Sequence, residues 1–224
     1  MKKGKFITIE GGDGAGKSTI IPLIVNYLNQ RLGIEAIATR DPGGTDFNYA
    51  LRELLLKSDN LTSITELLLF TAMRQELVYK IILPNINSGI SVVCDRFIDS
   101  TYAYQGIKNG LLSYSEQLEQ WTTEFAMPDH TFVLDIDPRE SYKRIKARDD
   151  NNRFDDYDLE SKALIREAFL HRAKDNARYT VIDANRPLDE VVNDITDKLC
   201  KVFDTFEEPN VEFVQSVLLG ALHE

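Results

Sequence analysis

The sequence predicts an α/β protein in which helices cover both faces of a five-stranded parallel sheet. Five short apolar runs alternate along the chain with segments of helical periodicity. Each run ends on polar residues, as expected where ligands bind beyond the carboxyl ends of parallel strands. The length of 224 residues and the apolar fraction of 43% suit one large domain with a single core.

The first half of the chain contains two strands and three helices. The predicted elements are a strand over 5–10, a helix over 19–32, a strand over 34–39 and helices over 48–57 and 64–83. Gly33 ends the first helix, and the turn-rich residues 41–44, Asp-Pro-Gly-Gly, follow the second strand. This order of strand, helix and strand requires a right-handed crossover and parallel pairing.

The second half contributes the remaining three strands. They are predicted over 90–94, 130–136 and 179–182, and they end on Asp95, Asp137 and Asp183. Residues 149–158 are the most polar stretch and are expected to form a loop between two helices. Pro209 breaks the preceding helix, and 211–222 fits one more amphipathic helix. We therefore divide the chain into a domain over 1–204 and a C-terminal extension over 205–224, expected to be helical.

Charge and cysteine content exclude several classes of protein. The 26 basic and 36 acidic residues give a net charge of -10, which argues against a general nucleic-acid or membrane surface. It does not exclude a phosphate ligand, because the charge in such a site is local. Cys94 and Cys200 show neither a CxxC spacing nor a His/Cys cluster, so no disulfide framework or zinc site is expected. The apolar run near the N-terminus is too short for a signal peptide. We expect a cytoplasmic protein.

A glycine-rich loop follows the first strand. Gly11, Gly16, Lys17 and Ser18 satisfy the pattern G-x-x-x-x-G-K-[ST]. Glycines let backbone N–H groups face phosphate oxygens, the lysine reaches the outer phosphates, and the serine hydroxyl can bind Mg²⁺. A plain glycine turn would not explain the helical pattern that begins at Lys17. The residues predicted to bind ATP here are Gly11, Gly12, Asp13, Gly14, Ala15, Gly16, Lys17, Ser18 and Thr19.

The loop alone does not separate a GTPase, an ATPase and a small-molecule kinase. The sequence contains no Asn-Lys-x-Asp motif of the kind that reads guanine. Asp95 at the end of a strand is followed at once by Arg96, which places a cation where a second phosphate could bind. A surface ion pair is the alternative interpretation of these two residues. The arrangement favours a kinase with a phosphorylated acceptor.

Three stretches together resemble the thymidylate kinase family. They are FITIEGGDGAGKST over 6–19, TRDPGGT over 39–45 and DRFIDSTYAYQG over 95–106. The first is general among phosphate-loop proteins, whereas the other two are specific to this family. The resemblance, which covers residues 5 to 200, implies a three-layer P-loop NTPase fold with a small lid at 144–160. It also implies a homodimer that transfers the γ-phosphoryl group of ATP to deoxythymidine monophosphate (dTMP) with Mg²⁺, in the synthesis of dTTP.

The resemblance assigns roles around the two phosphates. Asp95 would lie near the magnesium, with Ser18, and Arg96 would grip the acceptor phosphate. A guanidinium suits that task because it is always charged and binds phosphate in a bidentate fork. Arg40 would be a second phosphate contact. Asp41 either makes a contact or only shapes the turn at Pro42.

The resemblance also assigns the contacts of the base and the sugar. Phe70 and Arg74 are four residues apart and share a helix face. Taken alone, Phe70 is typical of a core residue, but the resemblance implies that it stacks on the pyrimidine while Arg74 donates to a base carbonyl. The other implied contacts are Thr101 and Gln105 at the base edge, Tyr104 beside the deoxyribose and Asp13 at the sugar 3'-hydroxyl.

The lid is expected to supply the catalytic charge, because Asp13 stands where the phosphate loop could have carried an arginine. Arg153 is predicted to be the catalytic arginine, with Arg148 assisting and Arg144 against the adenine. A solvated charged helix is the alternative explanation of these arginines. Two departures from the family concern an unusually acidic lid and Phe169, which replaces a common tyrosine. The predicted catalytic set is Lys17, Asp95, Arg96, Arg148 and Arg153.

Two alternatives to a dTMP kinase remain open. A kinase for another deoxynucleotide, above all dUMP, would differ only by one methyl group, for which a pocket discriminates by about 1 to 3 kcal/mol. A nucleotide-binding switch without catalysis would need a guanine-reading motif. It would have no use for Arg96, Phe70 and Arg74.

Overall fold

The structure is a computed structural model that describes residues 3–58, 60–147 and 157–205. The amino-terminal elements are β1 (Phe6–Gly11), α1 (Lys17–Gln30), β2 (Ala36–Arg40), α2 (Asp46–Lys57), α3 (Ser63–Leu77), the π-helical segment η1 (Val78–Ile82) and α4 (Leu83–Asn87). They continue with β3 (Ser91–Asp95), α5 (Ile98–Thr101), the π-helical segment η2 (Tyr102–Lys108), α6 (Leu112–Thr123) and β4 (His130–Asp135). The last elements are α7 (Pro138–Lys146), α8 (Leu159–Ala173), β5 (Tyr179–Asp183) and α9 (Leu188–Val202).

The five strands form one parallel sheet in the order β2-β3-β1-β4-β5. The predicted α/β class and five-stranded parallel sheet are therefore confirmed. Because the strands are parallel, their carboxyl ends meet at one edge of the sheet. The strand β1 occupies the centre, with Ile9 opposite Asp95 of β3 and Gly11 opposite Leu134 of β4. The loop that follows β1 therefore starts between the ends of two neighbouring strands.

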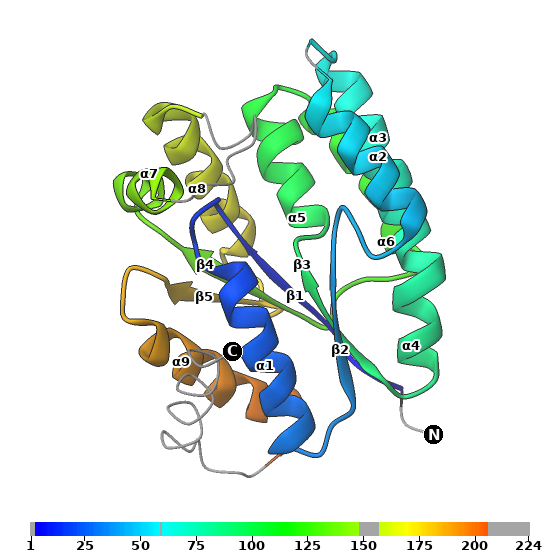
Figure 1. The fold of residues 1–224 in the computed structure, drawn as a ribbon, viewed down its shortest axis with the longest axis vertical. Helices are drawn as coiled ribbons and strands as arrows, with labels where there is room; N and C mark the ends of the chain where they lie inside the picture. The colour runs from blue at the N-terminus through cyan, green and yellow to red at the C-terminus, as the bar shows by residue number, and fades with distance from the viewer. Residues whose placement is uncertain (1–2, 59, 148–156, 206–224) are drawn as a thin grey trace.

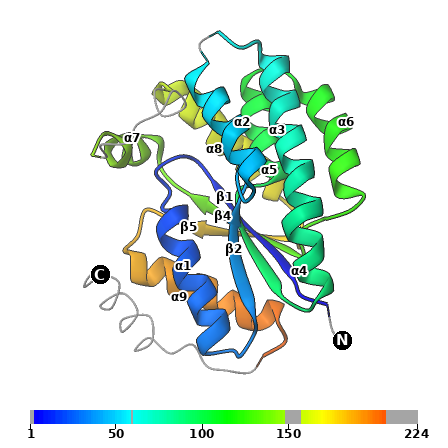
Figure 2. The ribbon, with the colours of Figure 1, turned by 45° about the vertical axis from the view of Figure 1, so that its right-hand side comes forward.

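Helices cover both faces of the sheet (Figure 1). On one face, α1 and α9 pack over a core that includes Ile7, Ile9 and Phe132. On the other, residues of α3 and η1 pack against Phe6 and Val92, while α8 and η2 cover Val133. Figure 2 shows α1 and α9 separated by the sheet from α3, α4 and α6. In the part of the chain that the structure describes, no helix is long and apolar enough to cross a bilayer.

Side chains of β1 alternate between these two cores, as the pleat of a strand requires. Ile7 and Ile9 face α1 and α9, whereas Phe6, Thr8 and Glu10 face the opposite layer. Both polar residues on that side are fully buried. The Thr8 hydroxyl pairs with that of Thr131 on β4, at 2.7 Å. Glu10, at the strand end, has different partners that belong to the functional site.

The predicted elements differ from the structure mainly at their ends. The single helix predicted over 64–83 is three segments, because the wider hydrogen bonding of η1 separates α3 from α4. Pro84 lies in the first turn of α4, where its missing N–H needs no partner. The segment η2 was not predicted as an element. The expected helix over 211–222 and the centre of the lid lie outside the described residues.

Candidate active site

The phosphate loop connects β1 to α1 through two glycines in left-handed conformations. Gly14 has φ 80°, and Gly16, with φ 91°, caps the first turn of α1. A side chain at position 14 would also meet a helix, because an added Cβ would lie 2.9 Å from the carbonyl oxygen of Ser141 in α7. Glycine is therefore needed at position 14 both for the turn and for the close approach of α7.

Lys17 is folded back onto this loop. Its ammonium group donates to the carbonyl oxygens of Gly11 and Gly12, at 2.9 and 2.8 Å. Burial, followed by the nearby charge of Arg96, lowers the pKa of Lys17 to about 8. The loop therefore presents a cation at its centre, already removed from water.

Asp13 is the acidic centre of the loop and joins two elements that follow β3. One carboxylate oxygen forms an ion pair with Arg96, and the other accepts from the Tyr104 hydroxyl at 2.8 Å. Although burial alone would raise it, the positive charges of Arg96 and Lys17 hold the pKa of the Asp13 carboxyl below its usual value. The main-chain oxygen of Asp13 accepts from Ser141 of α7, at 2.7 Å.

Arg96 directly follows β3 in a left-handed backbone conformation, with φ 68°. Such a conformation is uncommon for a residue other than glycine and marks a locally constrained turn. Its guanidinium donates to the Ser100 hydroxyl at 3.1 Å and to the Gly11 carbonyl at 3.3 Å. It also lies 5.2 Å from the centroid of the Tyr104 ring. The turn therefore directs Arg96 back toward the phosphate loop.

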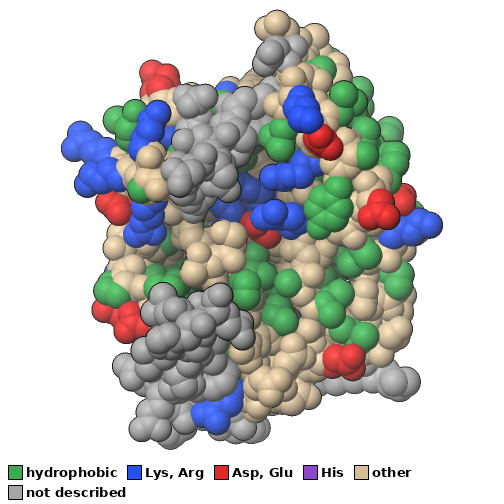
Figure 3. Space-filling model, in the orientation of Figure 1, with side chains coloured by type: hydrophobic (Ala, Val, Ile, Leu, Met, Phe, Trp, Pro, Cys, Tyr) green, Lys and Arg blue, Asp and Glu red, His purple; other side chains and the backbone are tan. Residues whose placement is uncertain are grey.

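A cavity of about 640 Å³ opens beside Arg96 and Asp13. This volume includes space that is open to solvent. Seven residues predicted to contact an acceptor line it, namely Asp13, Phe70, Arg74, Arg96, Thr101, Tyr104 and Gln105. Basic side chains gather around a hollow in the upper middle of the molecule (Figure 3), on a chain whose net charge is -10. We call this space the acceptor cavity.

Arg74 is fixed at the wall of the acceptor cavity by a buried ion pair. Its Nε donates to Asp41 at 2.5 Å, and its Nη2 donates to the Thr101 hydroxyl at 2.6 Å and to the Phe97 carbonyl at 3.2 Å. The Arg74 and Asp41 side chains are 4% and 1% exposed. Burial raises the pKa of the Asp41 carboxyl although Arg74 opposes the shift. Asp41 therefore orients the guanidinium in addition to shaping the turn.

Arg40 lies beside Asp95 and does not line the acceptor cavity. Its guanidinium donates to one Asp95 oxygen at 3.2 Å, and its side chain is 45% exposed. Among the described residues, no hydrogen-bond donor reaches the other Asp95 oxygen, although that atom is buried. An unsatisfied buried carboxylate oxygen fits a cation ligand. Ser18 is exposed at the start of α1, where its hydroxyl is accessible.

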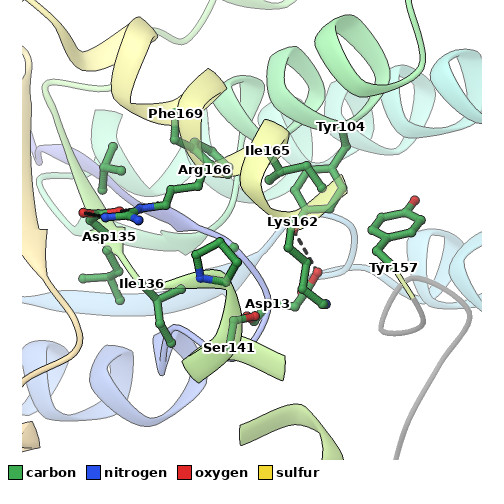
Figure 4. A pocket seen from close by; sticks show the side chains of 14 residues that line it. Asp13, Tyr104, Asp135, Ile136, Ser141, Tyr157, Lys162, Ile165, Arg166 and Phe169 are labelled. Atoms are coloured by element: carbon green, nitrogen blue, oxygen red, sulfur yellow. Dashed lines mark hydrogen bonds and ion pairs between the residues drawn. The ribbon is translucent and has the colours of Figure 1, made fainter. Parts of the chain in front are cut away.

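A second hollow lies between the phosphate loop, the end of β4 and helices α7 and α8. Figure 4 shows Asp135 and Arg166 facing each other at one end and Asp13 and Tyr104 at the other. Arg166 donates to both Asp135 oxygens, at 2.6 and 2.9 Å. This bidentate pair joins α8 to the carboxyl end of β4.

Comparison with known proteins identifies the family. A family model described as thymidylate kinase matches residues 9–195. A thymidylate kinase of Mycoplasmoides gallisepticum is 41% identical over 201 residues, covering 88% of this chain and 96% of its own. One from Wolbachia pipientis is 43% identical, with the same coverage. The crystal structure of thymidylate kinase from Ehrlichia chaffeensis aligns with a TM-score of 0.67 and 34% identity, over 98% of this chain and 99% of that one.

This chain belongs to the thymidylate kinase family. The resemblance predicted from three short stretches is thus confirmed over most of the chain. The roles assigned to individual residues are a separate matter, and they stay predictions.

The predicted lid arginines of this thymidylate kinase homologue are only partly described. Arg144 lies on α7 and donates to Glu140, one turn earlier, at 3.2 Å. Arg148 and Arg153 lie outside the described residues.

Three polar residues that line the acceptor cavity were not predicted as site residues. Arg52 of α2 points its guanidinium toward the Pro42 carbonyl, at 3.4 Å, and burial lowers its pKa. In the sequence, Arg52 is followed directly by Glu53 and looks like an ordinary charged residue of an amphipathic helix. Asp41 was considered as a turn residue only or a contact, and Ser100 was not considered. Their roles depend on tertiary partners that no sequence spacing reveals.

Proposed function

We propose that this protein is a thymidylate kinase that transfers the γ-phosphoryl group of ATP to dTMP, giving dTDP and ADP. The observation that carries the proposal is the acceptor cavity, in which an arginine beside the phosphate loop shares one space with Phe70 and Arg74. A pyrimidine nucleotide requires a cation for its phosphate, an aromatic stacking partner for its base and a hydrogen-bond donor at the edge of the base.

The chemistry needs alignment and charge more than covalent participation. An oxygen of the acceptor monophosphate is already a competent nucleophile, so no residue has to be modified. Lys17 would stabilise the outer phosphates of ATP, and Arg96 would hold the acceptor phosphate. Asp13, which is paired with Arg96 and Tyr104, would accept from the sugar 3'-hydroxyl. Arg52 lines the same cavity and would add a second cation near the acceptor phosphate.

Magnesium is proposed to bind at Asp95 and Ser18. The buried, unsatisfied Asp95 oxygen and the exposed Ser18 hydroxyl are oxygen ligands of the kind that Mg²⁺ prefers. When bound, the ion would neutralise charge on the ATP phosphates. Arg40 donates to the other Asp95 oxygen and would therefore lie close to the bound ion.

Lid arginines are proposed to complete the site, because Asp13 leaves the loop without a catalytic guanidinium. Arg153 would act on the migrating phosphoryl group, Arg148 would assist, and Arg144 would lie against the adenine. Replacing Arg153 with Ala is expected to lower kcat by several orders of magnitude and leave acceptor affinity nearly intact, as for charge supplied in the transition state. An unchanged kcat would assign the role to Arg148 or another group.

The protein is proposed to be a cytoplasmic homodimer. Both cysteines are free and buried, which suits a reducing compartment. Helices α2, α3 and α6 lie side by side (Figure 2) and expose large apolar side chains. These are Leu54, Leu68, Tyr79 of the adjoining η1, Tyr114, Trp121 and Phe125. Such a patch on a strongly charged chain marks an interface, and a second copy of this chain is its proposed occupant.

A coupled ADP-release assay tests the proposed reaction. It compares dTMP, dUMP, dCMP, dGMP and AMP as acceptors at fixed ATP and Mg²⁺, and dTMP should give the highest kcat/KM. A higher value for dUMP would move the assignment to the neighbouring nucleotide. Failure of every pyrimidine acceptor would reject the kinase proposal, and the switch alternative would then be tested by thermal shift with ATP against GTP.

A further inference from the structure

Glu10 is a fully buried carboxylate at the end of β1, directly before the phosphate loop. Its side chain points to the layer of α5, away from the loop. One oxygen accepts from the backbone N–H of Phe97 at 2.7 Å and from that of Ser100 at 3.3 Å. The other accepts from the Ser100 hydroxyl at 2.6 Å. Both carboxylate oxygens are therefore used to hold the segment that follows β3.

These bonds lie on either side of Arg96. Asp95, which precedes Arg96, lies opposite Ile9 of the central strand β1. Phe97 follows Arg96, and its backbone N–H donates to Glu10. The left-handed φ of 68° at Arg96 lies between these two fixed points. A non-glycine residue keeps such a conformation only where its surroundings enforce it. Glu10 supplies that enforcement on the carboxyl side of the turn.

Ser100 extends the connection to the Arg96 side chain. Its hydroxyl hydrogen is used in the bond to Glu10, so its oxygen lone pairs are available to accept. Arg96 Nη1 donates to this oxygen at 3.1 Å. The three groups form a chain in which guanidinium donates to hydroxyl and hydroxyl donates to carboxylate. A carboxylate at the end fixes the direction of both bonds, because it can only accept.

We propose that Glu10 is a positioning residue that holds Arg96 in its phosphate-binding orientation, through the Phe97 N–H and through the Ser100 hydroxyl. The inference rests on the proposed role of Arg96 at the acceptor phosphate. It gives the glutamate before the loop a task on the acceptor side of the reaction, whereas the loop itself, apart from Asp13, serves the donor.

The Glu10→Gln variant separates this role from simple packing, because glutamine has nearly the same size. Its amide oxygen can still accept from the two backbone N–H groups. Its NH₂ group, however, must donate where the carboxylate accepted, so the Ser100 hydroxyl hydrogen loses its partner. Ser100 then receives two N–H donors, and its bond to Arg96 weakens. The change should weaken binding of the acceptor phosphate, whereas the binding of ATP should not change.

Steady-state kinetics with dTMP and ATP at pH 8, above the pKa of about 7 of Glu10, tests the proposal. One hydrogen bond to a charged group contributes about 1.5 to 3 kcal/mol, so E10Q should raise the KM for dTMP at least about tenfold. The kcat value and the KM for ATP should change by less than about threefold, as expected when ground-state binding is lost. Ser100→Ala should have a similar effect. Thr8→Val is the matched control, since Thr8 is buried on the same face of β1 but pairs with Thr131.

A double-mutant cycle tests the connection itself. If Glu10 acts through Ser100, the E10Q/S100A protein should resemble the more severe single variant, and the two effects should not multiply. Fully multiplied effects would overturn the proposal, and so would a dTMP KM that stays unchanged in a folded E10Q or rises equally in T8V. If E10Q fails to fold, an unchanged KM in S100A overturns it instead.

The Arg96→Lys variant distinguishes failure of the positioning role of Glu10 from failure of the proposed role of Arg96. Lysine retains the charge but cannot form the fork with phosphate and Ser100. A raised dTMP KM in R96K with normal values in E10Q and S100A would reject the positioning role alone. An unchanged dTMP KM in R96K would reject the role of Arg96, on which the inference rests.

Discussion

The ion pair between Arg74 and Asp41 has a structural role in addition to the binding role that is proposed for Arg74. Both are almost fully buried, so each requires the other in order to remain charged away from water. Replacing Arg74 with Ala leaves Asp41 without its partner and should lower the free energy of unfolding by about 3 to 5 kcal/mol. Chemical denaturation measures this loss. The D41N/R74Q protein, which buries no charge, should recover part of the stability but not dTMP binding.

Substitution of Phe70 tests whether this side chain is only a core residue or also stacks on the base of dTMP. Stacking on a base contributes about 1 to 3 kcal/mol, so Phe70→Ala should raise the KM for dTMP by about 5- to 150-fold. Leu164→Ala changes an exposed helical leucine that lines neither the acceptor cavity nor the apolar patch, and it serves as the control. A large loss of stability with an unchanged KM would show that Phe70 belongs to the core only.

Glu10 should make the stability of the protein depend on pH. Burial, and then the negative charge of the buried Asp99, raise the pKa of Glu10 from 4.5 to about 7, while Arg96 opposes the shift. Asp99 itself is paired with Arg172 and Arg178. Because the folded-state pKa lies above the unfolded value, Glu10 destabilises the fold progressively as pH rises from 4.5 to 7.

Denaturation of E10Q and the parent protein at several pH values measures this effect. Glutamine does not titrate, so the stability of E10Q relative to the parent should increase between pH 5 and pH 8. A difference that is constant with pH would contradict the raised pKa. The comparison uses one substitution and therefore cancels the contributions of other titrating groups.

At the scale of elements, the phosphate loop and α7 lie so close together that a substitution that adds one methyl group should disturb their contact. Gly14→Ala must place a side chain at φ 80° and at 2.9 Å from the Ser141 carbonyl. Gly33→Ala has a similar φ of 62° but meets no atom within 4 Å. Both should lose about 1 kcal/mol for the left-handed backbone. Only G14A should also weaken ATP binding, measured as a smaller thermal shift on adding the nucleotide.

The sequence predicted elements well where periodicity or a glycine pattern determines them. All five strands and the phosphate loop were placed correctly, because buried parallel strands are apolar runs and the loop has a fixed spacing. The segments η1 and η2 were not predicted, since a change from α to π hydrogen bonding leaves no mark on apolar periodicity. This matters for function, because η2 carries Tyr104 and Gln105 to the acceptor cavity.

Side-chain partners were the least predictable part of the site. The acceptor residues taken from the resemblance do gather around one cavity, apart from Arg40. Asp41, Arg52 and Glu10 act through partners distant in sequence, and a buried carboxylate in a strand looks like any other polar residue. A glutamate at the end of an otherwise apolar central strand was the available signal.

At the scale of the whole molecule, the exposed apolar patch on α2, α3 and α6 predicts self-association. Leu68→Glu places a charge in its centre and should convert a dimer to a monomer in sedimentation or light-scattering measurements. Leu164→Glu on α8 is a matched control, because Leu164 is an exposed helical leucine away from the patch. A parent protein that is monomeric at micromolar concentration would contradict the proposed interface.

Lys17 connects the stability of the whole chain to its affinity for nucleotide. Its ammonium group leaves water when the protein folds, and two loop carbonyls then solvate it in place of water. If Lys17 binds the nucleotide phosphates as proposed, an arriving nucleotide would exchange carbonyl oxygens for phosphate oxygens and would not have to dehydrate the cation. The desolvation cost falls on folding, which makes the free protein less stable and the nucleotide site preorganised. The melting temperature should accordingly rise strongly on addition of ATP, because binding recovers the stability that was lost when folding removed the ammonium group from water.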